Sequence, residues 1–185
     1  MKKNRFAVFV VALLISLTAA SLHPAIAQDN TPTNPASVGT TVRSMIELGS
    51  VYTNIYDIGI TVLETVRTKV ETDGSKMPAG YDLVIARVKF DFKGRYVSDN
   101  LPFDLGTDPL QWIALSGSDL TEYEHISVNV PDPRLAGRIK PGESKEGWLA
   151  FAIRQGDSKP IMVFDPDTGG ATGRGRTLFF KLYKD

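Results

Sequence analysis

The sequence predicts an all-β fold in which two antiparallel sheets pack as a β-sandwich. The clearest observation is residues 81–92, YDLVIARVKFDF, where apolar and polar side chains alternate as in a half-buried strand. After the first 27 residues no segment keeps the 3.6-residue period of a long amphipathic helix, and Pro or Gly interrupts the chain often. Short apolar runs separated by turn residues favour two packed sheets, with a closed barrel as the alternative.

The first 27 residues predict export. A basic start with Lys2, Lys3 and Arg5 precedes the apolar run 6–17, and Ala-Ile-Ala at 25–27 has the small residues of a cleavage site. The apolar run is shorter than the roughly 20 residues that a membrane-spanning helix needs. We therefore expect a signal peptide at 1–27 that is cleaved after Ala27, no stable membrane anchor, and a secreted or periplasmic protein.

Composition limits the function classes open to the mature chain. Removal of the signal peptide takes three of the 21 basic residues and none of the 21 acidic ones, which leaves a net charge of about −3. That balance argues against a nucleic-acid partner, because such proteins present a basic face. There is no cysteine, so apolar packing has to stabilise the fold without disulfides.

The polar segment 28–37, QDNTPTNPAS, has no large apolar residue, and we expect it to be a flexible linker. Residues 38–185 then form one domain of about 7–9 strands. The expected strands, in chain order, lie near 42–48, 58–62, 81–92, 110–116, 123–130, 147–154, 160–164 and 177–183.

Alternation assigns the buried faces. In 81–92 the residues Val84 to Phe92 at every second position face the core, while Leu83 and Ile85 on the other face predict that a further segment covers that end. In 58–62 the alternation is followed by a loss of phase, which indicates a bulge. The last strand is expected to point Leu178, Phe180 and Leu182 inward.

Residues 140–151, KPGESKEGWLAF, raise the question of a serine nucleophile. The glycines around Ser144 are one residue too far apart for a nucleophile elbow, and a strand follows where the elbow needs a helix. The only base after residue 27 would be His125, which nothing in the sequence places nearby. Pro141-Gly142 is a turn dipeptide, so we interpret the stretch as a turn that begins a strand.

The same stretch carries a family resemblance. It resembles a family of exported bacterial domains of unknown function with an immunoglobulin-like sandwich, similar to the secreted immunoprotective extracellular antigen type. The matching residues are Ile139, Pro141, Gly142, Glu143, Gly147, Trp148 and Phe151, with Gly39, Val42, 84–92, Phe103, Leu105, 160–163 and 178–180. The resemblance implies an immunoglobulin-like fold and no catalytic residue.

Loop 164–176, FDPDTGGATGRGR, supplies the candidate metal ligands. Asp165 and Asp167 resemble the start of a calcium loop, although a full site needs six to eight oxygen ligands and Pro166 favours a plain turn. Arg174 and Arg176 between glycines suggest an anion site, but a strand follows where a dinucleotide fingerprint needs a helix.

Asp119, Glu122 and Glu124 form an acidic cluster beside His125. Two residues apart in a strand, Glu122 and Glu124 would lie side by side, as a cation site or a carboxylate-based hydrolase requires, whereas a solvated acidic face is the plainer interpretation.

The leading hypothesis is an exported, non-catalytic binding or adhesion module for an extracytoplasmic protein partner, with no cofactor. Its expected contact surface lies on loops 94–109, 131–138 and 165–176, or on a sheet edge. A small-ligand or calcium-binding protein is the alternative, and a hydrolase is the third.

Overall fold

The computed structural model describes residues 29–48, 54–96, 102–105, 111–166 and 173–185, and every named element in them is a β-strand. The all-β prediction is confirmed at this level, and the sheets are antiparallel. The described residues form ten strands, more than the expected 7–9. Three of them, β4, β6 and β9, were not expected and have only three residues each. The strands are β1 (Thr41–Leu48), β2 (Asn54–Thr68), β3 (Tyr81–Tyr96), β4 (Phe103–Leu105), β5 (Trp112–Leu115), β6 (Gly137–Ile139), β7 (Ser144–Arg154), β8 (Ile161–Phe164), β9 (Gly173–Gly175) and β10 (Leu178–Lys181).

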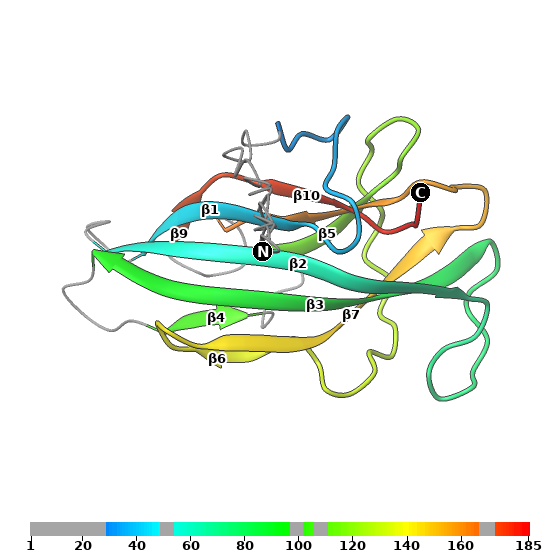
Figure 1. The fold of residues 1–185 in the computed structure, drawn as a ribbon. Coiled ribbons are helices and arrows are strands. Elements are labelled where there is room, and N and C mark those ends of the chain that lie inside the picture. Colours follow the sequence, from blue (N-terminus) through cyan, green and yellow to red (C-terminus); the bar gives the residue numbers. More distant parts are fainter. Residues whose placement is uncertain (1–28, 49–53, 97–101, 106–110, 167–172) are drawn as a thin grey trace, which may run out of the picture.

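The largest sheet has the strand order β7-β3-β2-β1-β9 and curls as a half-barrel (Figure 1). Its two long central strands, β2 and β3, pair antiparallel along their lengths. The register shifts between Val62 and Glu64, which is the bulge that the loss of phase predicted.

The core lies between this sheet and a second sheet of order β10-β8-β5, because side chains of both belong to one buried cluster. Alternate β3 residues from Val84 to Phe92 are fully buried, as predicted, and so are Leu178 and Phe180 of β10. Phe90 packs against three other phenylalanine rings at centroid distances of 5.7–6.4 Å. Each such side chain contributes about 1.5–3 kcal/mol of burial.

A smaller apolar cluster covers the outer face of β3 near its start, where Leu83 is fully buried. Ile126 and Val128 pack on it from residues 121–130, which we call the strap. This is the covering segment that Leu83 and Ile85 predicted.

The strand expected at 123–130 is wrong, because the strap that occupies these residues is not a strand. Apart from a single bridge between Leu115 and Glu122, it has no ladder partner among the residues that the structure describes. Side chains and isolated bonds hold it instead: the Asn129 amide donates to Asp73 at 3.0 Å, and its backbone N–H donates to Glu71 at 2.9 Å. The apolar alternation along the strap therefore results from side chains that are buried against the neighbouring sheet, and it does not indicate a strand.

Residues 29–37 differ from the flexible linker expected there. The segment lies along β10, where the Ala36 N–H donates to the Phe179 carbonyl at 2.9 Å. The buried Asn30 side chain accepts from the Phe179 N–H at 2.8 Å and donates to the Phe179 carbonyl at 2.6 Å. The Asn30 side chain thus bonds both backbone polar groups of Phe179 in β10. The segment is therefore held on β10 without a large apolar side chain.

Candidate functional site

Two turns at one end of the strands enclose a polar hollow of about 510 Å³. One turn, residues 116–120, follows β5, and the other, residues 155–160, joins β7 to β8. The lining consists of residues 116–119, Tyr123, Arg154 and residues 156–159. The far ends of β3 and β8, away from the hollow, are where residues 94–109 and 165–176, expected to carry function, begin.

The two turns touch at their backbones. A Cβ placed on Gly117 would lie 2.0 Å from the carbonyl oxygen of Lys159, so only glycine fits at this contact. Within each turn a side chain bonds its own backbone: Ser116 accepts from the Ser118 N–H at 3.3 Å, and Asp157 accepts from the Lys159 N–H at 2.9 Å. Such local bonds are why Ser and Asp favour turns.

The Asp157 carboxylate joins three segments around the hollow. One oxygen accepts from the Tyr123 hydroxyl at 2.7 Å and from the Gly117 N–H at 3.0 Å, and the other accepts from Lys159 of its own turn. Burial, followed by the bond to Asp157, raises the pKa of Tyr123 above its ordinary value. We call these contacts the Asp157 network.

Arg67 of β2 fixes the backbone of the second turn from behind. Its guanidinium donates to the carbonyls of Arg154 at 2.9 Å and Gln155 at 3.3 Å, and also to that of Asp157. The same guanidinium pairs with Asp82 at 2.8 Å. A planar group with five donors can hold several acceptors at once, so the wall is fixed before a ligand arrives.

The charged side chains of the hollow differ in whether they have an ion-pair or hydrogen-bond partner. Arg154 lies 6.0 Å from the centre of the Tyr123 ring, and neither it nor Lys159 has a carboxylate within ion-pair distance in the part of the chain that the structure describes. Hydrogen bonds, chiefly from Ser116 and Thr121, lower the pKa of the exposed Asp119 carboxyl, so it remains ionised at neutral pH. The lining therefore presents cations, a carboxylate and hydroxyls together.

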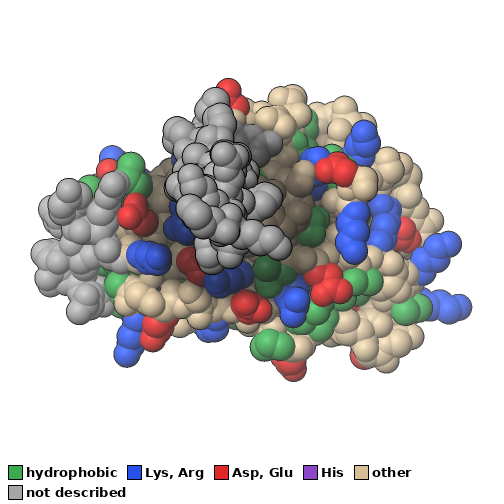
Figure 2. All heavy atoms as spheres, viewed as in Figure 1, with side chains coloured by type: hydrophobic (Ala, Val, Ile, Leu, Met, Phe, Trp, Pro, Cys, Tyr) green, Lys and Arg blue, Asp and Glu red, His purple; other side chains and the backbone are tan. Residues whose placement is uncertain are grey.

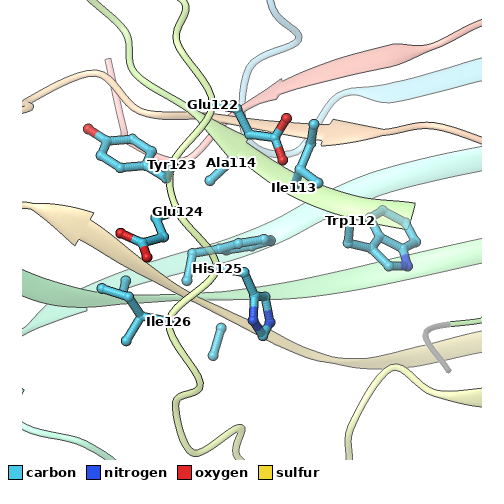
Figure 3. A pocket seen from close by; sticks show the side chains of 11 residues that line it. Trp112, Ile113, Ala114, Glu122, Tyr123, Glu124, His125 and Ile126 are labelled. Atoms are coloured by element: carbon cyan, nitrogen blue, oxygen red, sulfur yellow. The ribbon is translucent and has the colours of Figure 1, made fainter. Parts of the chain in front are cut away.

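Glu122, Glu124 and His125 line a different and much smaller cavity of about 50 Å³. It lies beneath the strap, between residues 112–114 of β5 and residues 150–152 of β7. Figure 3 shows the two glutamate carboxylates pointing away from each other. The side-by-side arrangement expected for them required a regular strand, and the strap is not one.

Ser144 is the first residue of β7, and its hydroxyl donates to Asp91 at 2.5 Å. Gly142 before it has a positive φ of 94°, and the Glu143 N–H donates to the Lys140 carbonyl at 3.1 Å. The structure confirms a turn that begins a strand, and it places His125 in the strap cavity.

The predicted calcium ligands are only partly described. Asp165 directly follows β8, and its N–H donates to the Gln111 carbonyl at 3.1 Å, whereas Asp167 lies outside the described residues. Among the residues that are described, no three His, Cys, Asp or Glu side chains gather as a metal site would need. Arg176 of the suggested anion loop donates to the Asn30 carbonyl at 2.7 Å.

Of the three loops expected to carry function, 131–138 is the one described throughout. It packs on β7, with Leu135 buried and its N–H bonded to the Trp148 carbonyl at 3.0 Å. Loops 94–109 and 165–176 lie partly outside the described residues.

The polar hollow itself was not predicted. The available signal was a pair of Ser, Gly and Asp clusters, SGSD at 116–119 and GDSK at 156–159, each of which indicates a turn. Nothing in either cluster shows that the other lies against it.

Comparison with protein-family models gives no match, and neither does comparison with curated proteins. Among solved structures, the chain is similar to a putative lipoprotein from Bacillus subtilis, with a TM-score of 0.45 and 14% sequence identity. The similarity covers 67% of this chain and 36% of that one, so the chain spans little more than a third of that protein. The described residues contain no helix long and apolar enough to cross a bilayer. A likeness at this level identifies neither a family nor an activity.

Proposed function

We propose that the protein is an exported, non-catalytic binding or adhesion module that contacts an extracytoplasmic partner through the polar hollow. The observation that carries this proposal is the combination of a rigid frame with cations that have no carboxylate partner among the described residues. Gly117 and the Asp157 network fix the turns, while Arg154, near the Tyr123 ring, and Lys159 form no ion pair with a described carboxylate. A preformed site loses less conformational entropy when it binds.

Export and fold type belong to the same proposal. The basic start, apolar run and small residues of 1–27 support cleavage after Ala27 and a secreted or periplasmic location. The antiparallel sheets with a shared core support an immunoglobulin-like sandwich and are compatible with the resemblance to the exported domain family. Mass spectrometry of the protein recovered outside the cytoplasm tests the cleavage position.

The charge pattern is in keeping with a contact surface restricted to a small site. Figure 2 shows basic and acidic side chains interspersed over the face in view. The face in view therefore supplies no broad field of one sign, and specific contacts on it have to come from the shape and chemistry of local sites.

The test is cross-linked capture from the producing cell's exported and surface fractions, read by mass spectrometry. Wild type is compared with Lys159→Glu, and with Lys140→Glu as the matched control, because Lys140 is an exposed lysine near the opposite end of β7. We expect a saturable partner that wild type and the control capture and that Lys159→Glu loses. Capture that is equal for all three proteins would exclude the hollow as the contact site, and absence of any saturable partner would overturn the proposed function.

A further inference from the structure

The hollow presents hydrogen-bond donors and acceptors in close alternation. Arg154 and Lys159 supply charged donors, and Asp119 supplies a carboxylate acceptor. The hydroxyls of Ser118 and Ser158 can serve as either donor or acceptor. The ligand that uses this lining best carries many groups that both donate and accept.

The balance of charge argues for a neutral ligand. Arg154 and Lys159 form no ion pair with Asp119 or Asp157, but the formal charges of these four lining side chains sum to zero. An anion would meet the exposed Asp119, and a cation would meet Lys159. Tyr123 is the one aromatic side chain of the lining, and the methylene stems of Arg154 and Lys159 add apolar surface beside the polar groups.

The hollow is also preformed and of suitable size. A volume of about 510 Å³ lies within the range of roughly 300–1,000 Å³ that is typical of small-ligand sites. Leu120, next to the lining, is exposed and has a positive φ of 60°, a conformation that non-glycine residues rarely adopt. Strained backbone of this kind concentrates at binding sites, where the surrounding structure maintains it.

We infer that the polar hollow binds a neutral saccharide. This inference rests on the proposed binding function and adds the chemistry that the module recognises. The sugar could belong to a glycan on the captured protein or to a free polysaccharide, and both would present the same hydroxyl groups to the hollow.

The experiment is a titration of the isotope-labelled protein, as purified, with glucose, galactose, mannose and their disaccharides, followed by amide NMR shifts. We expect saturable shifts at residues 116–119 and 156–159, with a dissociation constant in the millimolar range, which is typical of so small a ligand. Lys159→Met and Ser158→Ala should each weaken binding about three- to tenfold, since each removes a hydrogen bond. Lys140→Met and Ser127→Ala, both at exposed positions, should leave it unchanged.

Titrations with acetate, phosphate and glycine test the ligand classes that would contradict a saccharide site. If acetate or phosphate shifts the same amides while the sugars do not, the hollow is an anion site and the inference is overturned. A response to glycine alone would identify a zwitterion site, and a response to none of these probes would remove the saccharide assignment. In each of these cases, partner capture that still depends on Lys159 would leave the proposed function standing.

The two sources of the sugar are separated in the capture experiment. If free sugar competes with capture and enzymatic removal of glycans from the partner abolishes it, the glycan belongs to a protein. If the captured material survives protease digestion and remains competed by free sugar, it is a polysaccharide. Capture that free sugar does not affect would count against the inference.

Discussion

Removing the Tyr123 hydroxyl by Tyr123→Phe should destabilise the protein while leaving the ring beneath Arg154 in place. The hydroxyl donates to the Asp157 carboxylate at 2.7 Å, and hydrogen bonds to charged groups contribute about 1.5–3 kcal/mol. Asp157 keeps its donors from Gly117 and Lys159, so no carboxylate oxygen is left without a partner. We therefore expect a loss near the low end of that range, about 1.5–2 kcal/mol, and a melting temperature lower by about 3–8 °C.

The pH dependence supplies a second readout. The pKa of Tyr123 is raised in the folded protein, chiefly by burial and then by the bond to Asp157, so folding favours the protonated phenol. Its contribution to stability is complete below the unfolded pKa of about 10 and is lost as pH rises above it. Urea unfolding at neutral and alkaline pH should show the gap between wild type and Tyr123→Phe shrinking above about pH 10. Equal stability at neutral pH, or a gap that does not change with pH, would refute the role assigned to this bond.

The remaining predictions concern the contact between the turns, the core, the turn before β7 and the calcium loop. Gly117→Ala should cost about 1–3 kcal/mol in urea unfolding, because its Cβ would overlap a backbone oxygen; an unchanged midpoint would mean that the turns do not touch. Phe90→Ala should cost about 3–5 kcal/mol by leaving a cavity among three phenylalanine rings, and a loss below about 1 kcal/mol would contradict the packing described. Ser144→Ala should raise the pKa of Asp91, which the Ser144 hydroxyl and then Lys89 lower, and NMR titration of the carboxyl would show this; partner capture should not change, as loss of capture would reopen a functional role for the serine. If Asp165 and Asp167 bind calcium, added calcium should raise the melting temperature in wild type but not in Asp165→Asn, and an unchanged wild type would remove the calcium alternative.

Much of the central sheet could be predicted because strand periodicity and burial are local properties. The alternation along 81–92 identified the buried side chains from Val84 to Phe92, and the loss of phase after 58–62 identified the bulge at Val62. Both depend on neighbouring residues of one strand, so the sequence contains them directly.

The errors arose where a partner distant in sequence decides the structure. The strap alternates like a strand, but alternation reports burial of side chains and not the presence of a backbone partner. Residues 29–37 lack large apolar side chains, yet Asn30 binds the backbone of Phe179, 149 residues away. Gly117 and Asp157 are 40 residues apart, and they meet only because the strand order brings both turns to one end.

Hydrogen exchange on the chain with its captured partner tests the central claim most directly. If the partner contacts the polar hollow, the amides of residues 116–120 and 155–159 gain protection on binding, and the Lys159→Glu protein shows no gain. Protection confined to the strap, to loop 131–138 or to the edge strand β9, with both turns unchanged, would contradict the assignment of the binding site.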